Sequence, residues 1–543
     1  MRIISISFEG RGFLFIFVEN SLLMLAKVMS AAVSGIDALP VTVEAASSSG
    51  WSFSMVGLAD TAVKESYERI RTAMEQAGTE FPRSSTVVNL SPADLKKEGA
   101  SFDLPIAIGV LVASKKIQPT VSTERFMMVG ELSLDGSLLP VRGVLPMAIL
   151  ARKMGMDGLI VPAVNATEAA VVNNLSVYGA RSLLDVINFL CGVQAIEPTV
   201  VNTREEFAKA DSFFDCDFSE VRGQENVKRA FEVACAGGHN ILMIGAPGAG
   251  KSMMAKRVPT IMPPLSLAEA LETTKIHSVA GRLKGGSKLM TSRPFRAPHH
   301  TISSVALVGG GSNPMPGEIS LAHNGVLFLD EFPEFTRQVL EVLRQPLEDR
   351  HISISRAKYS IDYPASFMLV ASMNPCPCGY YNHPTKACTC GAGAVQKYLN
   401  RISGPLLDRI DIQIEILPVA FNELSSLKKG ESSADIRRRV VAAREIQTRR
   451  YADEPGVYCN AQMNKRLMEK YAVLDSACMS LLSKAMDRFD MSARCYDRIL
   501  KVSRTIADLE GCDEITPIHV SEALSYRNLD RSSWGATVQK MPF

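Results

Sequence analysis

The octapeptide Gly245–Ser252, which reads Gly-Ala-Pro-Gly-Ala-Gly-Lys-Ser, restricts the possible folds of this chain more than any other segment. Its two outer glycines are separated by four residues and followed by Lys and Ser, which is the pattern of a phosphate-binding loop. An apolar run over 241–244 precedes it and a helix-compatible stretch over 253–257 follows. The sequence therefore predicts a strand-to-helix turn that binds a nucleotide rather than a glycine-rich surface turn.

In such a turn, backbone N–H groups and the helix N-terminus point at the phosphates. We expect Lys251 to reach the outer phosphates and the Ser252 hydroxyl to face Mg²⁺. The Gly223-Gln224 turn, ahead of an amphipathic helix over 226–236, should lie near the adenine. The predicted nucleotide-binding residues are Gly245, Ala246, Pro247, Gly248, Ala249, Gly250, Lys251, Ser252 and Gln224.

Two further apolar runs end in polar side chains. Val326–Leu329 is followed by Asp330, which would hold Mg²⁺ together with Ser252, and by Glu331, which would orient and polarise the attacking water. A run over 367–373 is followed by Asn374, whose amide can hydrogen-bond the terminal phosphate or the water. The alternative for Asn374 is a turn residue ahead of a proline.

The apolar runs alternate with helical stretches, so a parallel sheet with crossover helices is expected over 218–418, with the site at the carboxyl ends of its strands. Residues 419–531 are predicted to form a helical bundle that acts as a lid, with helices over 435–451, 464–471, 476–488, 493–509 and 519–526. Residues 532–543 are a tail, and residues 192–217 are a polar linker.

Residues 24–191 mix strands and helices, as in an α+β module. The segments 97–101, 130–136 and 139–143 resemble the proteolytic domain of Lon-type proteases, which has a ribosomal S5 domain 2-like fold and a Ser–Lys dyad. Ser101 falls at the nucleophile position, but Val144 and Leu145 occupy the position of the base. We therefore predict an inactive copy of this domain and interpret Ser101 as a helix-start residue.

The apolar run Phe13–Val18 is too short to span a bilayer. We interpret residues 1–23 as an upstream extension and expect the domain to start at Met24. No membrane partner is predicted. The net charge of +2 comes from 59 basic and 57 acidic residues, so any contact with nucleic acid must be local.

Eleven cysteines, four of them in one short loop, suggest a reducing compartment and a metal rather than disulfides, and the expected location is the cytoplasm. Cys376, Cys378, Cys388 and Cys390 form two Cys-X-Cys pairs, which can close around a structural Zn²⁺. His383 lies between the pairs as a possible substitute ligand. The alternative is a reduced, cysteine-rich surface loop.

Together with Arg293–His300, Gly309–Gly311 and Ser492–Leu500, these motifs resemble the AAA+ ATPases of the magnesium-chelatase group and, within it, the bacterial YifB/ComM family. The resemblance extends over residues 24–531. It implies a hexameric DNA helicase that uses ATP and Mg²⁺ to drive branch migration during natural transformation. It also implies that Arg409 serves the neighbouring subunit's phosphate, with Arg401 as the rival, and that Arg494 reaches the nucleotide in cis, with Arg498 as the rival.

The expected DNA contact is a hairpin that starts near His351 and carries Arg356 and Lys358 near its tip, where a ring of such residues would suit a phosphate backbone. The basic, glycine-containing stretch 281–296 suits a mobile pore loop, but also a plain solvated one. No groove-reading motif indicates sequence specificity, so the predicted partner is single-stranded or branched DNA. The alternative function is a chelatase-like or remodelling ATPase that acts on a protein or a metal–porphyrin.

Overall fold

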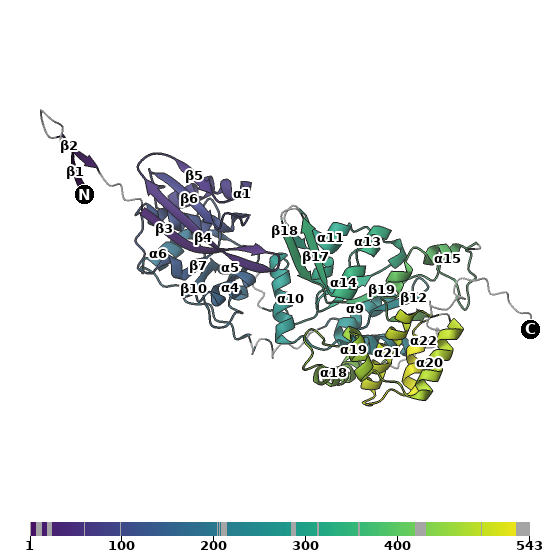
Figure 1. Ribbon diagram of the computed structural model, residues 1–543. Coiled ribbons are helices and arrows are strands. Elements are labelled where there is room, and N and C mark those ends of the chain that lie inside the picture. Colours follow the sequence, from purple (N-terminus) through teal and green to yellow (C-terminus); the bar gives the residue numbers. More distant parts are fainter. Residues whose placement is uncertain are drawn as a thin grey trace, which may run out of the picture. The chain divides into compact units, whose positions relative to one another are not determined.

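A computed structural model describes residues 2–6, 14–18 and 24–527, except for residues 59, 98, 204, 206, 208–213, 284–288, 312–313, 357–358, 392, 419–429 and 490. The chain divides into two compact units, residues 1–209 with 274–289 and residues 210–273 with 290–543 (Figure 1). Among the described residues, no helix is both long and apolar enough to cross a bilayer.

The first unit contains a seven-stranded mixed sheet in the order β11-β10-β7-β3-β4-β6-β5. Its strands are β3 (Met24–Ser34), β4 (Asp37–Ser48), β5 (Phe53–Val56), β6 (Ser85–Ser91), β7 (Phe126–Met128), β10 (Gly158–Pro162) and β11 (Ser176–Ala180). Its helices include α1 (Thr61–Lys64), α2 (Ser66–Gln76), α3 (Asp103–Ala113), α4 (Val144–Lys153), α5 (Ala163–Ala169) and α6 (Leu183–Leu190). Helix α3 packs on β3, β4 and α2, so nearly all of its side chains are buried. A helix buried on all sides must be apolar all round, as this one is. The predicted mixture of strands and helices is confirmed.

The apolar run near the amino terminus forms part of a hairpin. Strand β2 (Leu14–Val18) pairs antiparallel with β1 (Arg2–Ile6).

The second unit is organised around a five-stranded parallel sheet in the order β13-β16-β19-β12-β20. The strands are β12 (Ile241–Gly245), β13 (Phe295–Arg296), β16 (Val326–Leu329), β19 (Met368–Met373) and β20 (Ile412–Ile416). Parallel strands bring their carboxyl ends to one edge, so the residues that follow β12, β16 and β19 meet there. The predicted parallel α/β sheet is confirmed.

Both faces of this sheet are buried. Ile241 and Met243 of β12 contribute to one hydrophobic core, and Leu242 and Ile244 contribute to the other. Successive side chains of a strand point to opposite faces, so a strand covered on both sides reads as a continuous apolar run. This is why the strands of the second unit were recognisable as unbroken hydrophobic stretches.

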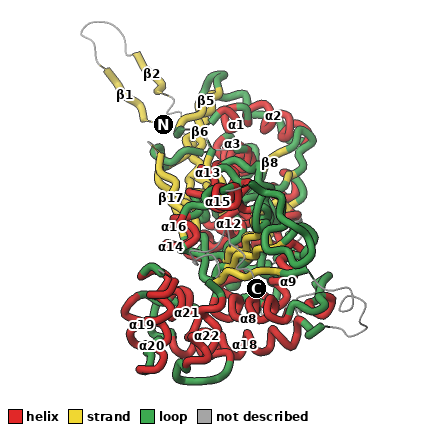
Figure 2. Tube along the Cα trace, turned by 90° about the vertical axis from the view of Figure 1, so that its right-hand side faces the viewer, coloured by secondary structure: helices red, strands yellow, loops and turns green. Residues whose placement is uncertain are grey.

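The predicted helical bundle follows the sheet. It comprises α18 (Ser433–Arg450), α19 (Lys465–Tyr471), α20 (Ser476–Phe489), α21 (Ala493–Leu509) and α22 (Pro517–Ser525), which Figure 2 shows gathered beside α8 (Glu225–Gly237). Helices α18 and α21 both pack on α8. Their apolar residues, such as Val440 and Ile506, share one core with Ile241 and Val326 of the sheet. The bundle is therefore built onto one face of the sheet rather than appended to its end.

One boundary differs from the sequence expectation. Helix α10 (Leu267–Val279) lies within the segment predicted as the ATPase domain, yet residues 274–289 group with the first unit. Lys275 forms an ion pair with Asp37, and Ser278 donates to the buried carboxylate of Glu168. Long-range bonds of this kind leave no local signal in a sequence.

Candidate nucleotide-binding site

The phosphate-loop segment has the expected strand–turn–helix context. It leaves β12 at Gly245 and enters α9 (Lys251–Ile261) at Lys251. Gly250 is the residue before the helix and has a φ of +86°, a left-handed conformation that glycine adopts without strain. In a strand–turn–helix arrangement of this kind, backbone amides and the helix N-terminus are available to bind an anion.

Asp330, which follows β16, is held by two hydroxyl groups, one in the first turn of α9 and one on the neighbouring strand β19. Ser252 Oγ donates to Asp330 Oδ2 at 2.6 Å, and Ser372 Oγ of β19 donates to Oδ1. The pairing of Ser252 with Asp330 is the one that a shared Mg²⁺ site requires. The sequence pattern alone assigns no role to Ser372, which lies on β19 two residues before Asn374.

Lys251 connects the loop to the adjacent strand. Its Nζ donates to Gly245 O at 2.6 Å, to Ala246 O at 3.0 Å and to Asn374 Oδ1 at 3.1 Å. Burial lowers the pKa of the Lys251 ammonium, while the carboxylates of Asp330 and Glu331 act in the opposite direction. The ammonium and the Asn374 amide therefore lie together where the terminal phosphates of a nucleotide would bind.

Glu331 directly follows Asp330 and differs from it in its surroundings. Its side chain is 57% exposed, and its backbone has a φ of +52°. His300 Nδ1 lies 3.3 Å from Glu331 Oε2. The sequence pattern alone gives His300 no role, because His300 and Glu331 lie on different segments and their contact depends on the fold.

The two candidate arginines for a neighbouring site differ in exposure. Arg409 is buried, and its guanidinium donates to Pro405 O at 2.5 Å and pairs with Glu348 Oε1 at 2.5 Å. The Arg401 side chain is 52% exposed and pairs with Glu334 at 2.8 Å. The Glu348 side chain is itself 49% exposed, so the Arg409 pair reaches the surface of the unit.

The two candidate arginines of the lid also differ. Arg498 Nη1 lies 3.0 Å from Oδ1 of the buried Asp411, where it joins the His239 imidazole. Burial raises the pKa of the Asp411 carboxyl, but the Arg498 cation and the His239 imidazole outweigh this effect and hold that pKa well below the usual range, so the buried carboxylate stays charged. Arg494, at the start of α21, is 62% exposed and lies 3.8 Å from Asp408. Arg498 thus joins the lid to the sheet, and Arg494 is the more accessible of the two.

Gln224 precedes α8 in a left-handed conformation with a φ of +59°. Its Nε2 donates to Leu417 O at 2.5 Å, just after β20. The turn is therefore fixed to the end of the strand that neighbours β12 in the sheet.

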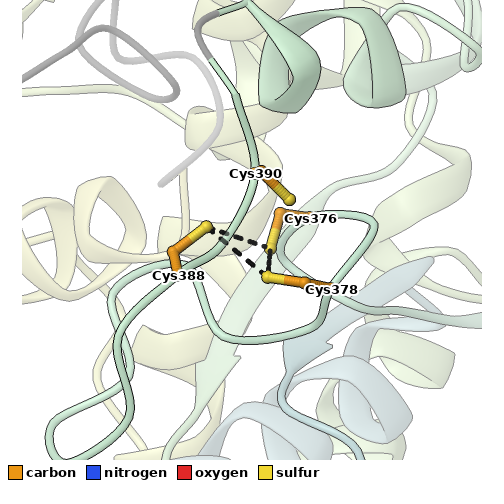
Figure 3. Close-up of side chains that lie close together, drawn as sticks. All are labelled: Cys376, Cys378, Cys388 and Cys390. Atoms are coloured by element: carbon orange, nitrogen blue, oxygen red, sulfur yellow. Dashed lines mark hydrogen bonds between the residues drawn. The ribbon is translucent and has the colours of Figure 1, made fainter.

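Four cysteines gather in the loop between β19 and α15 (Ala394–Leu399), as Figure 3 shows. Cys376 Sγ lies 3.3 Å from Cys378 Sγ and 3.7 Å from Cys388 Sγ, and the Cys378 and Cys388 sulfurs are 3.5 Å apart. The ligand atoms of the four residues, Cys390 included, all lie within 4.8 Å of one another. His383 is not part of this group, and its Nδ1 accepts from the backbone N–H groups of Thr385 and Lys386.

A second group with ligand-type atoms, Glu510, Cys512 and His519, has a different explanation. His519 Nδ1 accepts from the Thr516 backbone N–H at 3.0 Å, and its Nε2 faces Glu510 Oε2 at 2.9 Å. The acceptor role of Nδ1 requires that Nε2 carries the ring proton, so Nε2 is not free to bind a cation. His519 and Thr516 form the N-terminal cap of α22. The contact of His519 with Glu510 connects this cap to the end of α21.

The hairpin predicted to contact DNA consists of β17 (His351–Arg356) and β18 (Tyr359–Pro364). The hairpin itself is confirmed. Lys358 and the side chain of Arg356 are outside the described residues. In the first unit, Ser101 lies in the short helix η1 (Ala100–Phe102) ahead of α3, and Val144 and Leu145 are buried in α4.

Comparisons with known proteins identify the family of this chain. The family "Magnesium chelatase, subunit ChlI" matches residues 217–424, "Subunit ChlI of Mg-chelatase" matches 43–165, and "Magnesium chelatase, subunit ChlI C-terminal" matches 430–527.

The chain is 43% identical to "Competence protein ComM" of Haemophilus influenzae, over 93% of this chain and 98% of that protein. It is 44% identical to YifB of Salmonella typhimurium, with the same coverage. A distant match, 23% identical over 58% of this chain and 37% of the other, is the "Maternal DNA replication licensing factor mcm6" of Xenopus tropicalis. The chain belongs to the YifB/ComM family of magnesium-chelatase-like AAA+ proteins.

Proposed function

We propose that this chain is an ATP-driven DNA motor of the cytoplasm that works as a hexameric ring and drives branch migration during natural transformation and recombination. The observation that carries the proposal is the convergence of Lys251, Ser252, Asp330, Glu331 and Asn374 at one edge of the parallel sheet. Two relatives support the choice of substrate, since one is named as a competence protein and another as a DNA replication licensing factor.

Each side chain has a separable task in ATP hydrolysis. Lys251 would bind the outer phosphates, and Asn374, which accepts from Lys251, would contact the terminal phosphate or the water. Ser252 and Asp330 would hold Mg²⁺, which neutralises phosphate charge when it is bound. Glu331 would orient and polarise the water. The exposure of Arg494 suits a residue that contacts the nucleotide only when the lid closes on it.

The cysteine loop would hold one structural Zn²⁺. A tetrahedral zinc ion with Zn–S bonds of about 2.3 Å keeps its sulfur atoms about 3.8 Å apart, a spacing close to that of the Cys376, Cys378 and Cys388 sulfurs. A disulfide needs sulfurs about 2 Å apart, and the cysteines of this loop are free. Four thiolates without an acidic or water ligand are typical of a structural rather than a catalytic ion.

One experiment separates the motor from its main alternative, a chelatase-like or protein-remodelling ATPase, which the magnesium-chelatase description of the matched family favours. ATP turnover of the full chain should be measured without DNA and with single-stranded, forked and duplex DNA. A DNA motor predicts turnover that single-stranded or forked DNA increases several-fold. Turnover that no DNA form changes would refute the motor and favour the alternative.

The β17–β18 hairpin provides a test of the DNA contact. The double variant Arg356→Ala, Lys358→Ala should weaken DNA stimulation and reduce the salt dependence of binding, because each phosphate contact releases counterions. Lys484→Ala, on the exposed side of α20, serves as the charge-loss control and should leave both properties unchanged. Equal behaviour of the two proteins would remove the hairpin from the proposed interface.

A further inference from the structure

The cysteine loop touches the phosphate loop directly. Gly379 is buried and has a φ of +81°. A Cβ atom added to it would lie 2.5 Å from Cδ and 2.9 Å from Cγ of Pro247. Contacts below 3.0 Å force a shift, and the ring of Pro247 is part of the backbone, so it cannot move aside as a flexible side chain would. The main chain of the cysteine loop therefore rests against the third residue of the phosphate loop.

The same turn is fixed to the sulfur cluster. The Gly379 N–H donates to Cys376 O at 3.0 Å, so Cys376 and Gly379 are the two ends of one tight turn. Cys376 is fully buried, and its Sγ accepts from the Tyr381 N–H at 3.3 Å in addition to its contacts with Cys378 and Cys388. The position of the Gly379 backbone consequently depends on where the Cys376 and Cys378 sulfurs are held.

The first residue of the loop contacts Lys251. Asn374, which accepts from Lys251 Nζ at 3.1 Å, is two residues before Cys376. The start of the cysteine loop thus contacts the phosphate-loop segment at two points, through Asn374 with Lys251 and through Gly379 with Pro247.

We propose that the metal-bound cysteine loop is a positioning element of the ATP site, in which Gly379 supports Pro247 and thereby sets the phosphate loop for nucleotide binding. The inference rests on the proposed ATPase and on the proposed metal in this loop. Gly379 is a positioning residue, because it acts on the nucleotide through Pro247. The loss of the metal would let the turn relax and would weaken ATP binding at a site that contains no cysteine.

A matched pair of glycines tests the contact. Gly393 precedes α15 in a similar left-handed conformation, with a φ of +75°, and an added Cβ would meet no atom within 4 Å. Gly379→Ala and Gly393→Ala thus share the backbone strain of about 1 kcal/mol, and only the first disturbs Pro247. We expect Gly379→Ala to raise the KM for ATP about tenfold or more, with a smaller change in kcat and with the metal content retained. Gly393→Ala should keep the wild-type KM. Equal KM values in the two variants would refute the role of Gly379.

Metal removal provides the second test and does not depend on the folding of a variant. Zinc is removed from the full-length protein with a zinc-selective chelator, the chelator is dialysed away, and binding of a fluorescent ATP analogue is measured in excess Mg²⁺. Affinity should fall about tenfold and return when zinc is added. Unchanged affinity in protein shown to have lost its zinc would refute the positioning role. If the purified protein contains no zinc at the outset, the proposed metal is refuted. The comparison of Gly379→Ala with Gly393→Ala still tests the contact of Gly379 with Pro247 in that case.

Discussion

His300 Nδ1 lies 3.3 Å from Oε2 of Glu331, the carboxylate to which we assign the attacking water. Glu331 is largely exposed, so packing does not fix its side chain. The His300 ring has two aromatic neighbours. Its centroid lies 4.1 Å from the His299 ring centroid and 6.4 Å from the Phe335 ring centroid, the latter in an edge-to-face arrangement. The imidazole is therefore placed to orient the carboxylate that orients the water.

Replacement of His300 should slow hydrolysis without weakening ATP binding. We expect His300→Ala to lower kcat about tenfold, equivalent to ~1.4 kcal/mol, because Glu331 loses its orienting partner. The measurement is steady-state ATPase kinetics together with the binding of an ATP analogue. The double variant His300→Ala, Glu331→Gln should be no slower than Glu331→Gln alone. Additive losses would show that His300 acts independently of Glu331.

Lys251 and Glu331 should separate binding from hydrolysis. Lys251→Ala removes the charge that faces the phosphates and should weaken nucleotide binding by about 100-fold or more, the scale of a lost buried charge-assisted contact. Glu331→Gln keeps the shape of the side chain and should bind ATP normally while hydrolysis falls about 100-fold or more. Equilibrium binding and turnover are measured on the same preparations. Normal turnover in Glu331→Gln would contradict the role of this carboxylate.

The sequence predicted the elements that depend on local pattern. The apolar runs before Asp330 and Asn374 are buried strands. Because each of these two residues directly follows its strand, the sequence alone predicts that both lie at the carboxyl edge of the sheet. The contact of Lys251 with Asn374 follows because β12 and β19 are neighbours in the sheet. Such relationships need only the strand order and the direction of the chain.

The relationships that escaped prediction are contacts between distant loops. Neither His300 with Glu331 nor Gly379 with Pro247 is encoded in a spacing, because each pair joins segments whose separation is set by the packing of other elements. The same reason applies to Arg498, which sequence pattern could not distinguish from Arg494. Only the fold shows that the buried Asp411 holds Arg498.

Zinc should accompany the purified protein. If the four sulfurs bind one ion, freshly reduced protein should contain about one zinc per chain by metal analysis. Cys378→Ser, Cys390→Ser should lose it, whereas Cys512→Ser, outside the proposed ion site, should keep it. The absence of zinc from freshly reduced wild-type protein would contradict the proposed site.

Lys501 gives the lid a defined pH dependence. It lies on α21, and its Nζ donates to Ala461 O at 3.1 Å. Burial, reinforced by the Arg498 cation and opposed by Asp411, lowers the Lys501 pKa to about 8. Between about pH 8 and the unfolded value of about 10.4, the unfolded chain binds more protons than the folded chain, so stability rises with pH.

Lys501→Met should remove this titration. The variant should be more stable than the wild type near pH 7, by roughly 1–3 kcal/mol, and this advantage should shrink as the pH rises to about 10. Melting temperatures across this range provide the measurement. Lys484→Met, at an exposed position of α20, is the control and should run parallel to the wild type. A Lys501→Met advantage that stays constant with pH would contradict the lowered pKa.

Arg409 is proposed to complete the neighbouring subunit's site, although its guanidinium is paired with Glu348 within its own chain. An arginine that acts on a neighbour leaves its own phosphate loop, Asp330 and Glu331 intact. Arg409→Ala should therefore bind ATP almost normally, while its hydrolysis falls about 100-fold or more. Glu348→Ala frees the guanidinium and should retain hydrolysis. If Arg409 is only structural, Arg409→Ala and Glu348→Ala should instead lose hydrolysis to a similar degree, because each breaks the same ion pair.

Mixed rings decide between Arg409 and its rival. In a ring that mixes Arg409→Ala with Lys251→Ala subunits, some interfaces are complete. At these interfaces the Arg409→Ala subunit supplies an intact nucleotide site and the Lys251→Ala subunit supplies an intact Arg409. Such rings should recover part of the hydrolysis that neither variant shows alone. The parallel mixture with Arg401→Ala is the matched comparison, since Arg401 is 52% exposed and already lies at the surface of its unit. Recovery with Arg401→Ala, and none with Arg409→Ala in rings proven to be mixed, would transfer the role to Arg401.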